Sequence, residues 1–132
     1  MGAGVDLRVF LVEDLQRMRG LLVDLFASLG GFTVVGTAGT EAEANLWLVE
    51  HPGRWDVAVV DLVLDQGAGM NVIRHCKADP DGGRIVVFSS YASPGVRSHC
   101  LELGADAVFN KTETAQFIAW CDDLVSRENS GP

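Results

Sequence analysis

Short apolar runs alternate with longer amphipathic segments along the whole chain. The runs are rich in Val and Phe and are closed by polar or turn residues. This pattern is typical of strands that are buried on both faces in a parallel sheet. The predicted strands are Val9–Val12, Phe32–Ala38, Val57–Val60, Arg84–Ser89 and Ala107–Asn110.

The segments between these runs carry apolar residues at steps of three and four, which is the period of an amphipathic helix. The predicted helices are Leu15–Leu29, Glu41–Glu50, Met70–Ala78, Pro94–Leu103 and a last one that begins at Thr112 or Glu113. The expected buried stripes are Leu15, Met18, Leu22, Leu25 and Leu29 in the first helix, Val96, Cys100 and Leu103 in the fourth, and Thr114, Phe117, Cys121, Leu124 and Val125 in the last.

Several helix boundaries are marked by residues that favour starts and stops. Thr40 is expected to cap the second helix, with Glu43 three residues on as in a capping box. Ser93 followed by Pro94 gives the fourth helix an N-cap and a proline at its first position. Gly104 is expected to end that helix.

Five strands that alternate with five helices predict an α/β fold, a doubly wound five-stranded parallel sheet with helices on both faces. With 132 residues, of which 48% are hydrophobic, the chain has the size of one domain. We expect this domain to span residues 1–125 and the polar residues 126–132 to form a frayed tail.

Charge and spacing exclude several classes of partner and site. The net charge of −8 opposes binding to a phosphate backbone, so we expect no direct nucleic-acid partner. The cysteines form no CxxC pair, which favours small buried packing residues over a disulfide or zinc site, and the histidines lack metal-binding spacing and are expected on the surface. These residues are Cys76, Cys100 and Cys121, and His51, His75 and His99.

The sequence contains no membrane or export signal of the usual kind. No apolar stretch reaches 18 residues, and the stretch Met1–Gly4 lacks the charged start of a signal peptide. We therefore expect a cytoplasmic protein without membrane contact.

Four of the predicted strands end in groups suited to phosphate chemistry. These groups are Glu13-Asp14 after the first strand, Asp61 after the third, Ser89 at the end of the fourth and Lys111 after the fifth. Because open α/β sheets place their sites at the carboxyl ends of the strands, we expect them to share one crevice. Carboxylates, a hydroxyl and an ammonium suit Mg²⁺ and a phosphoryl group. Without a cation, like-charge repulsion should raise at least one carboxyl pKa.

Asp61 is the strongest candidate for a reactive group. It ends the most apolar run of the chain, and a carboxylate at the edge of a buried strand is costly unless a cation is near. Its best role is that of a nucleophile that attacks phosphorus to give an aspartyl phosphate, with the metal offsetting the repulsion between two anions. Lys111 would supply an opposing ammonium and Ser89 a hydroxyl donor.

From about Arg8 to Val125 the chain resembles the receiver domains of two-component response regulators. The matching residues are Glu13-Asp14, Asp61 in Val-Ala-Val-Val-Asp-Leu-Val-Leu, Gly69, Ser89, and Lys111 after Gly104-Ala105-Asp106. The resemblance implies a flavodoxin-like fold of the receiver type with Asp61 as the phosphoacceptor. It implies further that Asp14 and Asp61 bind Mg²⁺ directly with the carbonyl of Val63, that Glu13 binds it through water, and that Ser89 and Lys111 contact the phosphoryl group.

The same resemblance implies the partners and the class of activity. The phosphoryl group would come from a histidine kinase or a histidine phosphotransfer protein, and the chain would be a signalling domain and not an enzyme. A downstream protein would bind the face formed by Pro94–Leu103, Ala107–Asn110 and the last helix, which Trp120 is expected to reach. Formation of a homodimer stays open.

The chain departs from the common receiver pattern at three places. Leu64-Asp65 stands where Met-Pro is frequent, and Thr112 stands where a proline often follows the lysine. Val108 stands where many receivers carry a switching Tyr or Phe, so the loop with Tyr91 is expected to take up the change instead. This departure leaves an alternative open, in which the domain is a phosphorylation-independent interaction or dimerisation module.

Two other phosphate-handling classes do not fit the sequence. A P-loop enzyme requires GxxxxGK[ST], which does not occur. A haloacid-dehalogenase-like phosphatase requires an Asp-x-Asp pattern, and Val63 holds its second position here.

Overall fold

Five parallel strands form one sheet in the order β2-β1-β3-β4-β5 in the computed structural model, which describes residues 4–129. The strands are β1 (Leu7–Val12), β2 (Phe32–Ala38), β3 (Val57–Val60), β4 (Arg84–Ser89) and β5 (Ala107–Asn110). The bounds predicted for the last four strands are confirmed, and β1 begins two residues before the predicted Val9. Residues 1–3 belong to the stretch that was expected not to be a signal peptide, and residues 130–132 belong to the expected tail. Both segments lie outside the described residues.

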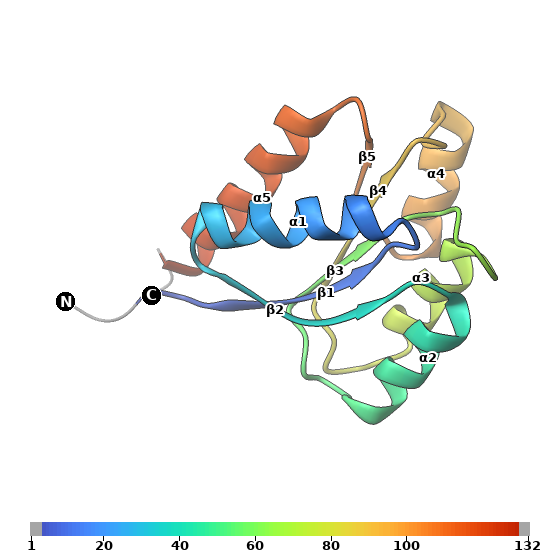
Figure 1. Cartoon of the computed structure of the whole chain (residues 1–132), viewed down its shortest axis with the longest axis horizontal. Coiled ribbons are helices and arrows are strands. Elements are labelled where there is room, and N and C mark those ends of the chain that lie inside the picture. Colours follow the sequence, from blue (N-terminus) through green and yellow to red (C-terminus); the bar gives the residue numbers. More distant parts are fainter. Residues whose placement is uncertain (1–3, 130–132) are drawn as a thin grey trace.

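The five helices cover the two faces of the sheet unequally (Figure 1). They are α1 (Gln16–Leu29), α2 (Glu41–Glu50), α3 (Gly69–Lys77), α4 (Pro94–Leu103) and α5 (Thr114–Asn129). Helices α1 and α5 pack on one face around Phe26 and Phe117, whereas α2, α3 and α4 pack on the other around Ile73 and Cys100. The α/β, doubly wound, flavodoxin-like fold expected from the sequence is therefore confirmed.

The predicted caps of α2 and α4 form as expected. The N–H of Glu43 donates to the Thr40 hydroxyl at 3.1 Å, and the N–H of Val96 donates to the Ser93 hydroxyl at 3.4 Å. The Glu43 carboxylate accepts a hydrogen bond from the N–H of Gly39, one residue before the donor that a standard capping box would use. Both helices begin and end at the predicted residues.

The buried stripe predicted for α1 is wrong at its first residue. Leu15 precedes the helix in an extended conformation and its side chain is 57% exposed. Phe26, absent from the predicted stripe, is fully buried together with Leu22. These two residues are four apart, so a helix that begins at Gln16 directs them, and not Leu15, toward the sheet.

The last helix also differs from its prediction at both ends. Thr114 is exposed, and the buried residues are Phe117, Cys121 and Leu124. The helix continues to Asn129, so residues 126–129 are helical where the sequence predicted a frayed tail. The Asn129 side chain accepts a hydrogen bond from the N–H of Val5 at 3.0 Å, which fastens this end of α5 to the start of the sheet.

The predictions for cysteine and histidine are confirmed with one exception. All three cysteines are buried, and burial raises the pKa of the Cys76 and Cys121 thiols to about 12. His75 and His99 are exposed, but His51 is half-buried because its ring stacks on Trp47 with centroids 4.4 Å apart. Among residues 4–129, no helix has the length and apolar character needed to cross a membrane.

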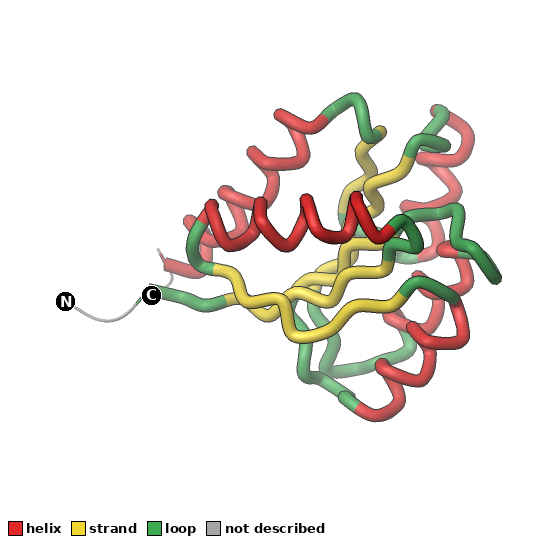
Figure 2. Tube along the Cα trace, in the orientation of Figure 1, coloured by secondary structure: helices red, strands yellow, loops and turns green. Residues whose placement is uncertain are grey.

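The order of the strands determines where a site can form. The chain leaves β1 to one side for β2 and returns on the other side for β3, so β1 and β3 are neighbours at a topological switch point. Figure 2 shows the loops that follow β1, β3 and β4 at the same end of the sheet. In sheets of this type a ligand crevice lies outside the carboxyl ends of the strands at that point.

Candidate functional site

Three carboxylates meet where β1 and β3 end side by side. Glu13 and Asp14 follow β1 and Asp61 follows β3, and the sheet hydrogen bonds continue through both ends: the N–H of Glu13 donates to Ala38 and that of Asp61 to Val12, each at 2.9 Å. One carboxylate oxygen from each of the three residues lies within 4.8 Å of the others. The predicted convergence of these carboxylates is confirmed.

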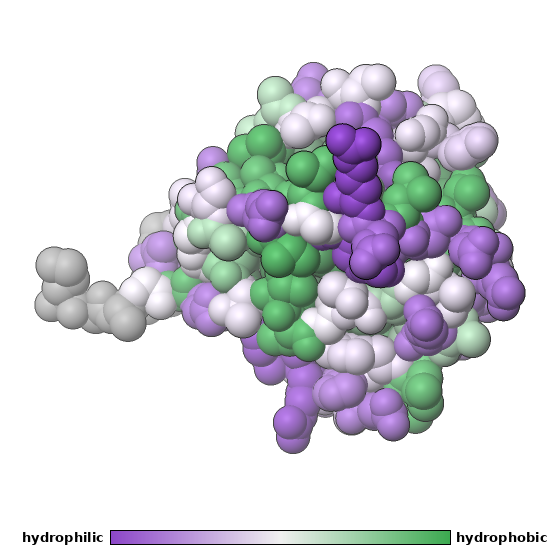
Figure 3. Space-filling model, in the orientation of Figure 1, coloured by the Kyte–Doolittle hydropathy of each residue, from purple (hydrophilic) through white to green (hydrophobic). Residues whose placement is uncertain are grey.

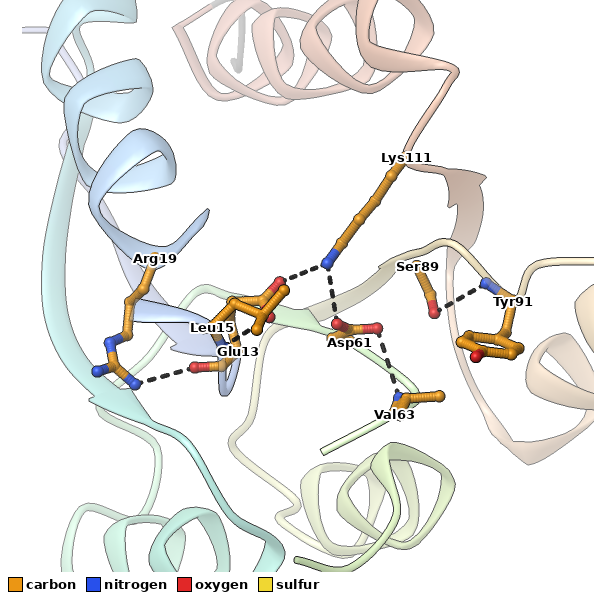
Figure 4. Close-up of polar contacts among 8 residues, drawn as sticks. All are labelled: Glu13, Leu15, Arg19, Asp61, Val63, Ser89, Tyr91 and Lys111. Carbon is orange, nitrogen blue, oxygen red and sulfur yellow. Dashed lines mark hydrogen bonds and ion pairs between the residues drawn. The ribbon is translucent and has the colours of Figure 1, made fainter. Parts of the chain in front are cut away.

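Lys111 reaches this cluster from the loop after β5. Its ammonium lies 2.7 Å from a carboxylate oxygen of Glu13 and 2.9 Å from Oδ2 of Asp61 (Figure 4). The sequence separations are 98 and 50 residues, so only the fold brings these groups together. The predicted placement of Lys111 in the site is confirmed.

Burial and charge determine the protonation behaviour of the cluster. Glu13 is 2% exposed and Asp61 is 6% exposed. Burial is the main cause that raises the pKa of Glu13, and the charge of Asp61 adds to it against the opposing hydrogen bond from Lys111. Repulsion, expected from the sequence to be the cause, is therefore secondary. Burial lowers the pKa of Lys111, but its bonds to Glu13 and Asp61 outweigh this effect, so the pKa is raised.

The Lys111 ammonium alone does not balance the negative charges of the cluster. When all are ionised, three carboxylates face one ammonium, which leaves an excess of two negative charges. The ligand atoms that the three acidic residues offer are carboxylate oxygens, which hard divalent ions such as Mg²⁺ prefer. The residues present therefore fit Mg²⁺ in both charge and donor type.

A pocket of about 210 Å³ opens beside the cluster. It is lined by Asp14, Leu15, Asp61, Val63, Ser90, Tyr91 and Lys111. The apolar lining residues Leu15, Val63 and Tyr91 are 57%, 46% and 64% exposed, so they form an outer rim around a polar floor. Leu15 was expected in the helix core; its place at this rim is explained by its position before α1.

Ser89 ends β4 as predicted but does not line this pocket. Its side chain is fully buried, and its hydroxyl accepts a hydrogen bond from the N–H of Tyr91 at 3.3 Å. Figure 4 shows Ser89 on the Tyr91 side of Asp61. The next residue, Ser90, lines the pocket instead. The Ser89 hydroxyl therefore lies buried beside the site, where it accepts from Tyr91 and keeps its own O–H free to donate.

The loop after β3 packs tightly against Asp61. A Cβ atom on Gly69 would lie 2.0 Å from the carbonyl oxygen of Asp61, so only glycine allows this approach. The N–H of Val63 donates to Oδ1 of Asp61 at 3.4 Å, which places Val63 beside the Asp61 carboxylate. Gly69, expected from the sequence in the loop, is instead the first residue of α3 and has a steric role next to the site.

The contacts of two arginines near the site were missed from the sequence. The Arg19 guanidinium donates to the backbone carbonyl of Glu13 at 3.0 Å. Arg97 of α4 donates to the carbonyl of the buried Val108 and forms a 2.9 Å ion pair with Glu113, just after the loop that carries Lys111. The local pattern carries no signal for such contacts, because each joins a helix to a residue in a loop or strand outside it.

Comparison with known proteins gives a family match over most of the chain. Residues 9–119 match the family model described as the response regulator receiver domain. The chain is 35% identical over 99 residues to the DNA-binding transcriptional activator DevR/DosR of Mycobacterium tuberculosis, covering 74% of this chain and 44% of that protein. It spans less than half the length of the curated relatives it matches.

Solved structures show the same fold. The phosphorylated cyanobacterial phytochrome response regulator RcpA superposes with a TM-score of 0.76 at 24% identity, covering 96% of each chain. The CheX-CheY-BeF3-Mg complex of Borrelia burgdorferi gives a TM-score of 0.73 at 21% identity, covering 79% of this chain and 77% of that one. With the acidic cluster, the lysine and the family match in agreement, the chain belongs to the response regulator receiver domain family.

Proposed function

We propose that Asp61 accepts a phosphoryl group in two-component signalling. The observation that carries this proposal is the setting of its carboxylate, which is almost buried, lies 2.9 Å from the Lys111 ammonium, and shares a cluster with two further carboxylates at the floor of an open pocket. A carboxylate held in this way is accessible to a ligand and has a cation beside it to stabilise added negative charge.

The acidic residues would hold Mg²⁺ beside Asp61. Asp14 and Asp61 would bind the ion directly together with the backbone carbonyl of Val63, and Glu13 would act through water. When bound, the ion offsets the repulsion between the carboxylate and an incoming phosphoryl group. The Ser89 hydroxyl and the Lys111 ammonium would contact the phosphoryl oxygens, the former by donating the O–H that its bond from Tyr91 does not use.

The proposed reaction transfers one group between two nucleophiles. A carboxylate oxygen of Asp61 forms a bond to phosphorus while the N–P bond of a phosphohistidine breaks, and the departing imidazole nitrogen keeps the electron pair and takes up a proton. The chain is consumed as a substrate in this step although Lys111 assists it. We therefore class it as a signalling domain and not as an enzyme.

Two structural neighbours support this chemistry by analogy. RcpA is phosphorylated in its crystal structure, and the CheY complex contains BeF3 and Mg. Because both are under 25% identical to this chain, the likeness shows a shared fold alone. Their ligands indicate the kind of group that such a fold can accept. The residues proposed above supply the corresponding groups in this chain.

A histidine kinase or histidine phosphotransfer protein is the proposed donor. An apolar groove of about 250 Å³ between α1 and α5 borders the site and shares Lys111 with it. Leu21, exposed on α1, and Met18 and Leu25 line this groove, and Figure 3 shows apolar areas on this side of the molecule among hydrophilic ones. A helix that carries a phosphohistidine would contact this groove while it presents its phosphoryl group to Asp61.

The proposed output surface is the face of α4, β5 and α5. Trp120 is half-buried and lies edge-on to Phe109 with ring centroids 6.5 Å apart, so it flanks the core beside β5 as expected. Five expectations from the sequence stay predictions. They are the downstream target, homodimer formation, the lack of a nucleic-acid partner, the cytoplasmic location and the domain boundary at residue 125.

Incubation with acetyl phosphate and Mg²⁺ tests the proposal. The wild-type chain should gain the mass of one phosphoryl group, and the gain should vanish with chelator or in Asp61→Asn. Asp65→Asn is the matched control, because it removes an exposed carboxylate four positions on in the same loop. Equal labelling of the wild type and Asp61→Asn would contradict the proposal. No labelling of the wild type would favour the phosphorylation-independent interaction module.

A further inference from the structure

The loop after β3 is tied to the start of α2 by one side chain, Glu41. A carboxylate oxygen of Glu41 accepts hydrogen bonds from the N–H of Ala68 and from the side-chain amide of Asn71, each at 3.0 Å. The N–H of Glu41 donates to the carbonyl of Gln66, also at 3.0 Å. Three hydrogen bonds from one residue thus join α2 to the end of the loop and to the first turn of α3.

This tie leads directly to the pocket. Ala68 pairs with Val63 in an isolated antiparallel bridge, and Val63 lines the pocket and donates its N–H to Oδ1 of Asp61. A carboxylate that fixes Ala68 therefore also fixes the residue that lies against the reactive carboxylate. Glu41 itself does not line that pocket, so its influence must act through the loop.

The loop needs such a tie because its own sequence does not stiffen it. Between Leu64 and Ala68 it contains no proline, and Gly67 adopts a φ of +92° that other residues rarely adopt. Gly67 also packs against Glu41: a Cβ atom at Gly67 would lie 2.3 Å from the Cβ of Glu41. The glycine thus permits both the turn and the close approach of the carboxylate.

The electrostatic behaviour of Glu41 agrees with this geometry. The hydrogen bond from the N–H of Ala68, followed by that from Asn71, lowers the pKa of Glu41. The ionised carboxylate, which accepts both bonds, is therefore the form that the folded protein favours at neutral pH.

We propose that Glu41 is a positioning residue for the metal site, which holds the Val63 segment so that its backbone carbonyl can serve as a ligand. The inference rests on the proposed function, since it takes the Mg²⁺ site as given. Partners that orient metal ligands without touching the metal typically contribute about tenfold or more to metal affinity.

Titration of Mg²⁺ by calorimetry, with three single variants, tests this role. Glu41→Ala removes the acceptor and should weaken Mg²⁺ binding about tenfold. Glu41→Gln keeps an oxygen acceptor but loses the charge, and it should bind Mg²⁺ within about twofold of the wild type, in contrast to the loss expected of the alanine variant. Glu50→Ala, at the far end of the same helix, should bind like the wild type.

The variants also separate positioning from simple charge or folding effects. Metal-free melting temperatures should be similar for all four proteins, and amide exchange at Val63 and Ala68 should be faster only in Glu41→Ala. Equal Mg²⁺ affinity of Glu41→Ala and the wild type would overturn the inference while leaving the metal site intact. Equal weakening in Glu41→Gln and Glu41→Ala would also overturn it, because the effect would then be one of charge. Absence of saturable Mg²⁺ binding by the wild type would contradict the proposed function itself.

Discussion

The ammonium of Lys111 lies 2.9 Å from Oδ2 of Asp61 and 2.7 Å from Glu13, so one cation spans two nearly buried carboxylates. A buried ion pair contributes little net stability, but removal of one partner leaves an uncompensated charge, which is costly. The site therefore depends on the Lys111 ammonium. With three carboxylates ionised, it still carries an excess of negative charge that a second cation would neutralise.

Mg²⁺ should stabilise the folded protein, because it neutralises the excess negative charge of the cluster and binds only the folded form. We expect the melting temperature to rise with Mg²⁺ relative to chelator at matched ionic strength. Asp14→Ala removes a proposed direct ligand and should largely abolish this rise. Equal melting temperatures of the wild type in both conditions would rule out the metal site.

Replacement of Lys111 should destabilise the metal-free protein. Lys111→Met leaves Glu13 and Asp61 without their ammonium partner, at an expected cost of about 3 kcal/mol in the free energy of unfolding. Added Mg²⁺ should reduce this loss, because it supplies the missing positive charge. Urea unfolding with and without Mg²⁺ measures both effects. The control is Lys77→Met, at the other lysine of the chain, which is exposed on α3 and should change little; a Lys111→Met protein as stable as this control would contradict the pairing.

Acid should weaken a second ion pair at the opposite end of the sheet. The hydrogen bond from Arg8 is the main cause that lowers the pKa of Asp56. A carboxyl whose folded-state pKa lies below its unfolded value of about 3.9 adds stability above that pH, and this stability is lost as the pH falls through the folded-state pKa.

Asp56→Asn should therefore be less stable than the wild type at pH 6, by about 1 kcal/mol for a partly exposed pair. The difference should shrink at pH 3 and below. Urea unfolding at several pH values checks this, and a difference that stays constant down to pH 2 would show that the ionised pair is not its source.

Phosphorylation should change the β4–α4 loop and the α4–β5–α5 face. The Ser89 hydroxyl is buried and accepts from the N–H of Tyr91, so a shift of this hydroxyl toward a phosphoryl oxygen should move the loop that is bonded to it. Val108 has no ring to move, and Arg97 holds its carbonyl, so the change should pass through residues 90–96.

Amide spectra with and without beryllofluoride test this route. Shifts are expected from Ser90 to Val96 and near Trp120. Shifts confined to the neighbours of Asp61 would refute the switch and support the interaction-module alternative.

The sequence was sufficient for the parallel α/β fold and for the carboxylates at the strand ends, because the strands and helices each carry a local pattern. An apolar run marks each buried strand, and the fold then forces Glu13, Asp61 and Lys111 to the same edge. Features that depend on contacts between distant elements were not predictable. The tie of Glu41 to Ala68 joins α2 to the loop after β3, and the helical turn at Asn129 is held by Val5, at the other end of the chain.

Some local predictions failed because a periodic stripe does not determine where a helix begins. Leu15 matched the apolar period but lies before the first turn of α1, where its exposed side chain lines the pocket. Ser89 was placed correctly at its strand end, but whether its hydroxyl faces the pocket or a backbone N–H depends on the rotamer, which the sequence does not show.

The identity of the modified residue decides whether Asp61 is the phosphoacceptor. The phosphorylated chain can be reduced with borohydride, which converts only an acyl phosphate to an alcohol, and the altered residue can then be located by peptide mass spectrometry. We expect a single site of reduction at Asp61, formed only with Mg²⁺ and a phosphodonor. Reduction at Glu13 or Asp14, or none at all in a chain that has gained a phosphoryl group, would contradict it.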